Sequence, residues 1–63
     1  MKLTLRQART GVELSQEEMA ERLGVSTVTY NSYEKDPKKM KVGMLVQFSK
    51  VTGIDLSMLK LEG

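Results

Sequence analysis

The sequence predicts a compact all-α domain of five short helices. Of its 63 residues, 40% are hydrophobic and 29% are charged. Apolar residues recur at spacings of three and four, and no stretch shows the strict alternation of a β-strand. Polar residues that cap helices stand before the apolar runs, and Gly stands after two of them. A chain of this length forms a single domain over residues 1–63, and such a domain buries about 60% of its unfolded surface.

Caps and glycines set the expected helix boundaries. Thr4 and Ser15 each begin a capping box, because Gln or Glu stands three residues later. Gly24 and Gly53 occupy the left-handed position that ends a helix. The expected helices span residues 5–10, 16–23, 27–34 and 42–51, and the fifth follows Asp55 and carries Leu56, Met58, Leu59 and Leu61. The fourth is expected to bury Val42, Leu45, Val46, Phe48 and Val51.

The third expected helix has an unusual composition for a core helix. It reads TVTYNSYE and is rich in Thr, Val, Asn and Ser, which are mediocre helix formers. Tyr30 and Tyr33 lie three residues apart and are interpreted as core. The residues left on the other faces are Thr27, Val28, Asn31 and Ser32. Small hydroxyl, amide and methyl groups suit contacts with base edges in a DNA major groove.

The segment from Ser15 to Glu34, SQEEMAERLGVSTVTYNSYE, resembles the helix-turn-helix of the phage repressor and Cro-like family. The motifs SQEEMA, LGVS and YE carry the resemblance, which extends over almost the whole chain. It implies a lambda-repressor-like DNA-binding domain, with the helix-turn-helix formed by helices 2 and 3. It also implies a structural salt bridge between Arg9 and Glu34, and a Gln16 that bonds a DNA phosphate. The family usually has Gly where Glu13 stands, so the loop before Ser15 is expected to differ in shape.

The expected DNA contacts lie mainly on and after the third helix. Its N-terminus enters the groove first, so Thr27 and Val28 are expected deepest, with their methyl groups on thymine methyls. Asn31 is expected to pair with adenine or to bond a phosphate, and Ser32 to bond bases with little discrimination. The expected phosphate contacts are Gln16, Thr29, Lys38, Lys39 and Lys41. Without Arg or Gln in this helix, specificity is expected to rest on methyl packing and DNA deformability.

Surplus apolar residues near the chain end predict a contact between two copies. Five short helices need fewer apolar side chains than this sequence supplies. The residues expected on a dimer surface are Met44, Ile54, Met58 and Leu61. In the family, the segment between the last two helices and the chain end forms a twofold contact. The resemblance therefore implies a weak homodimer assembled on DNA, and flexible Met filling of the core is the alternative.

The composition argues against an enzyme. The chain has no His and no Cys, and it shows neither a Gly-rich phosphate loop nor carboxylates at metal-ligand spacing. No catalytic residue, metal, cofactor or small-molecule substrate is therefore expected. No apolar run approaches the ~18 residues of a membrane span, so no membrane partner is expected. A cytoplasmic protein of a bacterial or phage-infected cell fits these features.

The leading functional hypothesis is sequence-specific binding of double-stranded DNA by a repressor of phage or prophage type. Two copies would bind a near-palindromic operator, with half-sites about one helical turn apart. Antitoxins and restriction–modification controllers share this fold and remain alternatives. A protein-interaction module that lost DNA binding is another. A start at Met1 and five compact helices fit a complete small protein, and the N-terminal domain of a longer repressor fits as well.

Overall fold

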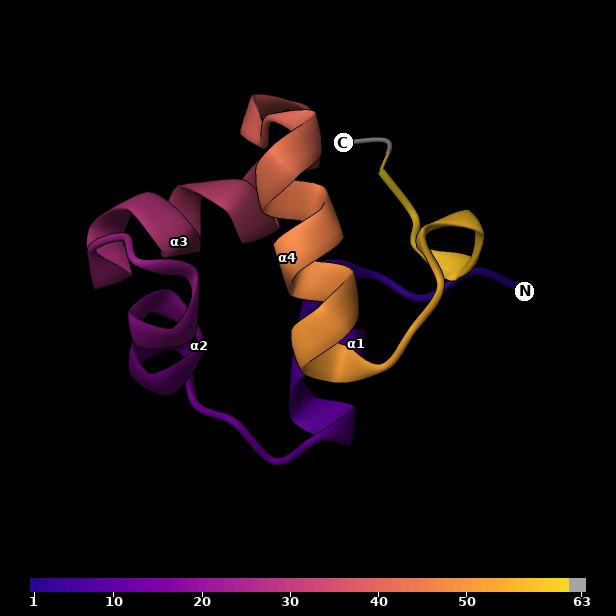
Figure 1. Ribbon diagram of the computed structural model, residues 1–63, viewed down its shortest axis with the longest axis horizontal. Coiled ribbons are helices and arrows are strands. Elements are labelled where there is room, and N and C mark those ends of the chain that lie inside the picture. Colours follow the sequence, from indigo (N-terminus) through magenta and orange to yellow (C-terminus); the bar gives the residue numbers. More distant parts are fainter. Residues whose placement is uncertain (62–63) are drawn as a thin grey trace.

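The computed structural model describes residues 1–61, which form four α-helices and two short turns of 3-10 helix. The elements are α1 (Leu5–Gly11), α2 (Gln16–Leu23), α3 (Thr27–Lys35), η1 (Pro37–Lys39), α4 (Val42–Thr52) and η2 (Leu56–Met58). Figure 1 shows α2 and α3 on one side of the domain, α1 and α4 beside them, and the N-terminal segment and η2 on the other side. The predicted all-α class is confirmed for the described residues. None of their helices is long and apolar enough to cross a membrane.

The four α-helices begin where predicted and end within one residue of the predicted position. The hydroxyls of Thr4 and Ser15 accept hydrogen bonds from the backbone N–H three residues later, at 3.1 and 3.0 Å. Both capping boxes are complete, because the Gln and Glu side chains accept from the cap N–H in return. Gly24 and Gly53 have φ angles of 73° and 72° and end α2 and α4 in the left-handed conformation. Local capping chemistry therefore accounts for most of the helix boundaries.

The predicted fifth helix is wrong, because only the single turn η2 forms there. Asp55 caps this turn as expected, but Leu59 then adopts an extended conformation with φ −92° and ψ 135°. Leu3 donates its N–H to the Met58 carbonyl at 2.8 Å, and its own carbonyl accepts from Lys60 at 2.6 Å. These two bonds form an isolated parallel bridge between Leu3 and Leu59. The N-terminal segment thus forms hydrogen bonds with the Met58 carbonyl and the Lys60 N–H, which a longer helix would need for its own backbone bonds.

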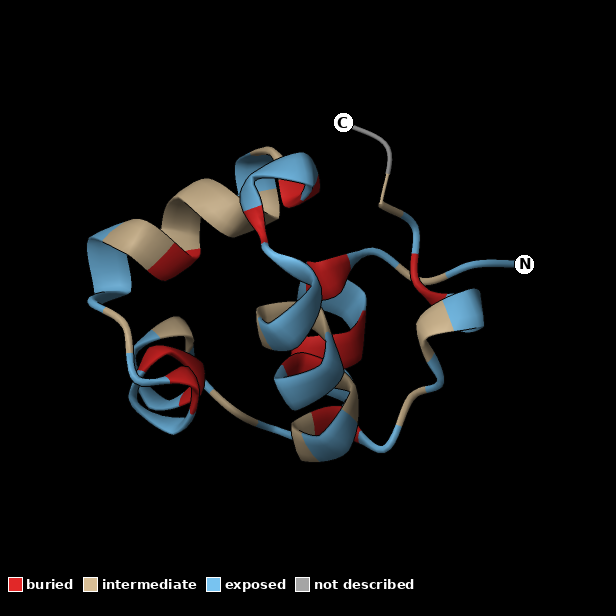
Figure 2. Cartoon of the chain, turned by 45° about the horizontal axis from the view of Figure 1, so that its top comes forward, coloured by how far each residue is buried: buried red, intermediate tan, exposed pale blue. Residues whose placement is uncertain are grey.

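The core combines apolar side chains from all four α-helices and the chain end. Its buried members are Leu5, Ala8, Met19, Ala20, Leu23, Tyr30, Met40, Phe48 and Leu59. Tyr30 stacks on Phe48 with ring centroids 6.5 Å apart, and Tyr33 meets Tyr30 edge-on at 6.5 Å. The interpretation of Tyr30 as a core residue is confirmed. Figure 2 shows α3 as mostly half-buried along its length, with exposed residues at its start.

The buried face of α4 is narrower than predicted. Phe48 is fully buried, but Val42 is 74% exposed and Val46 is 38% exposed. With about 3.6 residues per turn, these two valines lie together on a side of the helix away from Phe48 and Thr52. They were wrongly assigned to the core, because a run of apolar residues does not reveal which of its members point outward.

The loop before Ser15 reaches its cap without a glycine. Glu13 adopts a φ of 59°, the left-handed conformation that a Gly at this position favours. A left-handed conformation costs a residue with a side chain roughly 1–2 kcal/mol, because the Cβ crowds the backbone. The substitution of Glu for the usual Gly is therefore accommodated by strain at this residue.

Candidate nucleic-acid interface

The N-terminal end of α3 presents apolar methyl groups to solvent. Ser26 caps the helix by accepting a hydrogen bond from the Thr29 N–H at 3.1 Å, and this places Thr27 and Val28 at its tip. Both are exposed, and 81% of the Val28 surface is accessible. Tyr30, on the opposite side, is fully buried. A helix that is anchored by one face thus holds a branched apolar side chain outward, without a partner among residues 1–61.

The hydroxyl groups farther along α3 are already engaged within the helix. Ser32 donates its Oγ hydrogen to the Thr29 carbonyl at 2.6 Å. Thr29 Oγ1 accepts from the Ser26 hydroxyl at 2.9 Å and keeps its own hydrogen for another acceptor. Ser32 can donate to a base only if its present bond breaks. Of the expected base-reading residues, Thr27, Val28 and Asn31 therefore remain the better placed.

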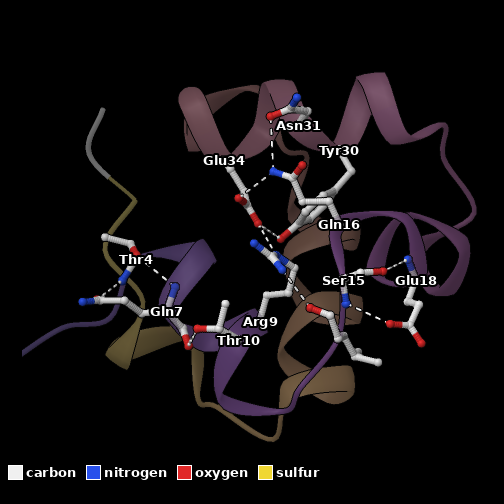
Figure 3. A network of polar contacts seen from close by, with 11 residues as sticks. Thr4, Gln7, Arg9, Thr10, Ser15, Gln16, Glu18, Tyr30, Asn31 and Glu34 are labelled. Carbon is white, nitrogen blue, oxygen red and sulfur yellow. Dashed lines mark hydrogen bonds and ion pairs between the residues drawn. The ribbon is translucent and has the colours of Figure 1, made fainter.

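A buried ion pair ties α1 to α3. Arg9 Nε donates to Glu34 Oε2 at 2.7 Å, and Arg9 Nη1 donates to the Leu14 carbonyl at 2.8 Å. The Tyr30 hydroxyl donates to the same Glu34 oxygen at 2.6 Å (Figure 3). The two charged side chains are only 10% and 8% exposed. This is the pairing that the family resemblance implied, and its burial distinguishes it from two solvated charges.

The ionisation of this cluster follows from its contacts. Burial disfavours the charged form of Glu34, but hydrogen bonds from Arg9, Tyr30 and Gln16 outweigh it and hold the pKa of Glu34 below its ordinary value. The hydrogen bond to Glu34 raises the pKa of Arg9. Burial, followed by the hydrogen bond to Glu34, raises the pKa of Tyr30 far above its ordinary value. At neutral pH Glu34 is therefore a carboxylate, and Tyr30 is a neutral donor.

Gln16 joins this cluster from the first turn of α2. Its Nε2 donates to Glu34 Oε1 at 3.0 Å and to Asn31 Oδ1 at 3.3 Å (Figure 3). Both amide hydrogens are thus used by α3, whereas a phosphate offers acceptors only. The expected phosphate bond from this side chain requires one of these contacts to break. The Ser15 cap takes the Glu18 N–H, and the remaining backbone N–H groups in the first turn of α2 are the better donors to an anion.

An open hollow of about 550 Å³ lies between α1, α2 and α3 beside this cluster. Its lining consists of Arg6, Arg9, Ser15, Gln16, Asn31, Glu34 and Lys35. Arg6 and Lys35 are exposed cations, and sequence reasoning assigned neither of them to the site. The sequence places Arg6 one helical turn before Arg9, and this spacing could have identified Arg6 as part of the site. The hollow therefore combines positive charge with the N-terminus of α2.

The expected phosphate-binding lysines lie on and after η1. Asp36 Oδ1 accepts a hydrogen bond from the Lys38 N–H at 3.3 Å, and Pro37 is buried at the start of the turn. This turn forms inside the segment that was expected to be a loop. The side chains of Lys38, Lys39 and Lys41 are exposed. The only salt bridge among residues 1–61 is the pair between α1 and α3, so these lysines are available to DNA phosphates.

The four side chains expected on a dimer surface are partly exposed. Met44, Ile54 and Leu61 are half-buried and pack against the core. Met58, on η2, is 45% exposed. Met58 is thus the most exposed of these four side chains.

The chain that forms this interface matches a known protein family. Residues 5–59 match the model of a helix-turn-helix family, and this span includes all four α-helices and both 3-10 turns. Comparison with curated proteins and with solved structures gives no match. The family match supports binding of double-stranded DNA by a transcription regulator in general. The chain belongs to the helix-turn-helix family of Cro- and C1-type DNA-binding proteins.

Proposed function

We propose that this protein is a transcriptional repressor of phage or prophage type, which binds a near-palindromic operator as a homodimer and occludes a promoter. The observation that carries the proposal is the exposed tip of α3. Val28 is 81% exposed on a helix whose opposite face is buried, and Thr27 stands beside it. An apolar methyl surface of this kind fits the C5-methyl groups of thymines in a major groove.

Contacts to the DNA backbone would hold α3 in the groove. Lys38, Lys39 and Lys41 lie close to the C-terminal end of α3 and are exposed. Thr29 retains a hydroxyl hydrogen for a phosphate, and Arg6 and Lys35 add positive charge beside the first turn of α2. Phosphate contacts of this kind supply affinity and position, whereas contacts with the bases supply specificity.

The size of the domain suits two copies on one face of the duplex. The domain measures 28 × 22 × 18 Å, and half-sites one helical turn apart lie about 34–36 Å from centre to centre. Two domains on such a site would meet near the dyad through their chain ends. The side chains proposed for that contact are Met44, Ile54, Met58 and Leu61. Because three of them are half-buried and Met58 is only 45% exposed, we expect a weak dimer that assembles on the DNA.

The test begins with selection of binding sites from a random duplex library. Affinity for the selected duplex and a scrambled duplex is then measured by fluorescence anisotropy at about 50 and about 200 mM salt. We expect selective binding that weakens steeply with salt, because phosphate contacts release counterions. Val28→Lys should lose selectivity, because a charged side chain replaces the methyl contact. Lys38→Ala/Lys41→Ala should bind less tightly on all sequences and with a shallower salt dependence.

A matched pair of lysines away from α3 serves as the control. Lys50 and Lys60 are exposed on the last turn of α4 and near the chain end, so Lys50→Ala/Lys60→Ala removes the same charge. This variant should keep the wild-type salt slope. Binding that is absent, or indifferent to sequence, would contradict the repressor proposal and favour a protein-interaction module. The exposed Val42 and Val46 on α4 would then be the surface to probe for a protein partner.

A further inference from the structure

The side-chain amide of Gln16 is held in one orientation by a charge. Glu34 is paired with Arg9 at 2.7 Å, and a carboxylate can only accept hydrogen bonds. The Gln16 amide lies 3.0 Å from the second Glu34 oxygen, so its nitrogen must face the carboxylate. The reversed amide would place its oxygen against Glu34, and two acceptors would repel each other. The ion pair therefore sets the orientation of Gln16.

Gln16 in turn sets the orientation of Asn31. The same Gln16 nitrogen has a second hydrogen, which is directed at Asn31 from 3.3 Å. A hydrogen-bond donor needs an acceptor, so the oxygen of Asn31 must face Gln16. The Asn31 nitrogen points away from Gln16, as Figure 3 shows. This nitrogen lies one helical turn after Thr27 and Val28, on the outer side of α3.

We propose that Asn31 contacts DNA only as a hydrogen-bond donor and reads guanine rather than adenine, with Gln16 as the residue that positions it. This inference rests on the proposed DNA-binding function. Recognition of adenine by Asn uses both amide atoms, because adenine presents the N7 acceptor and the N6 donor. The Asn31 oxygen faces Gln16 and points away from the outer side of α3, so it is not placed to accept from N6. Guanine presents N7 and O6, which are both acceptors and suit the two hydrogens of one nitrogen.

The other possible DNA ligands differ from guanine in ways that an experiment can resolve. Cytosine presents a donor at this edge, which opposes an Asn31 donor. Thymine offers the single acceptor O4, so it should be bound less well than guanine. A phosphate also accepts, but contact with a phosphate would produce no base preference. Sequence preference therefore distinguishes the proposed guanine contact from contact with the DNA backbone.

The test compares binding-site profiles of wild type, Asn31→Ala and Gln16→Met. Met retains the length of Gln without its amide. One position in each half-site should lose its base preference in Asn31→Ala, and guanine should dominate that position in wild type. In Gln16→Met the freed amide can turn, so the preference for guanine over adenine should fall by about fivefold or more. Gln47→Met makes the same change at an exposed position of α4 and should leave the profile unaltered.

A modified duplex tests the same contact in the unmutated protein. Replacing guanine by 7-deazaguanine at the Asn31-dependent position removes the N7 acceptor. Wild type should bind this duplex several-fold more weakly, and Asn31→Ala should bind both duplexes equally. The inference is overturned if adenine dominates the position, if no position depends on Asn31, or if Gln16→Met keeps the wild-type profile. Wild type without any selective binding would instead overturn the repressor proposal itself.

Discussion

Replacing Arg9 by Met will show how far the domain depends on its buried ion pair. Met keeps an unbranched apolar stem but removes the donors to Glu34 and to the Leu14 carbonyl. Glu34 is only 8% exposed, so its carboxylate would stay buried without the opposing charge. Loss of one partner from a buried pair costs about 3–5 kcal/mol, whereas an exposed pair contributes about 1 kcal/mol or less. Burial therefore decides in favour of the larger figure.

That figure is large beside the total stability of the domain. At about 0.05–0.15 kcal/mol per residue, 63 residues correspond to roughly 3–9 kcal/mol. We expect Arg9→Met to lose half or more of its unfolding free energy. Urea titration followed by far-ultraviolet circular dichroism will measure the loss. With a denaturant slope of about 1 kcal/mol per molar, the midpoint should fall by about 3–5 M, or no folded baseline should remain.

Two further variants make this prediction refutable. Arg6→Met lies on the exposed side of α1 and should change the unfolding free energy by no more than about 0.5 kcal/mol. Arg9→Met/Glu34→Met also removes the unpaired Glu34 carboxylate. It should be more stable than Arg9→Met alone, because apolar pairs can replace buried ion pairs at little cost. A loss below about 1 kcal/mol in Arg9→Met would refute the reasoning. A double variant less stable than Arg9→Met would refute it as well.

Four further outcomes are expected. Because folding lowers the pKa of Glu34 below its ordinary value of 4.5, its stabilising contribution is complete above that pH and is lost as the pH falls through the lower folded value. The urea midpoint should therefore decline in acid, and less so in Glu34→Gln. Glu13→Gly should raise the unfolding free energy by up to about 1 kcal/mol, since Gly tolerates the φ of 59°. Gly43→Ala should raise it by about 0.5–1 kcal/mol in the same titration, because a Cβ at this position of α4 meets no atom within 4 Å. Replacing thymine by uracil throughout the selected operator should weaken DNA binding by wild type in the anisotropy assay, because uracil lacks the C5-methyl group. The same replacement should weaken binding by Val28→Ala less.

Local chemistry explains why most helix boundaries could be predicted. A capping box or a left-handed glycine depends on residues three or four positions apart, and these interactions form in nearly the same way in any fold. The sequence therefore predicts the helix starts at Thr4 and Ser15 and the helix ends at Gly24 and Gly53. The contact between Arg9 and Glu34 is not local, and it was available only through the family resemblance.

The features that were missed depend on distant partners. The turn η2 stops short because Leu3 pairs with the segment around Leu59, and no pattern near Asp55 reveals that pairing. Val42 belongs to an apolar run but points outward, because neighbouring elements decide which face of α4 is covered. The hydrogen bonds of Gln16 are of the same kind. Its position at a helix N-terminus suggested a phosphate contact, and no local pattern reveals the two acceptors that α3 provides.

One carboxylate links the stability of this domain to its proposed specificity. Glu34 receives hydrogen bonds from Arg9, Tyr30 and Gln16, so it connects α1, the core and α2 to the helix that would enter DNA. α3 is built from mediocre helix formers and depends on such contacts for its position. Loss of Glu34 should therefore weaken DNA binding, although Glu34 itself is not proposed to contact a base. Loss of Gln16 should alter base preference and leave the Arg9 pair in place. Unfolding free energy and base preference, measured together on these two variants, separate the anchoring role from the reading role.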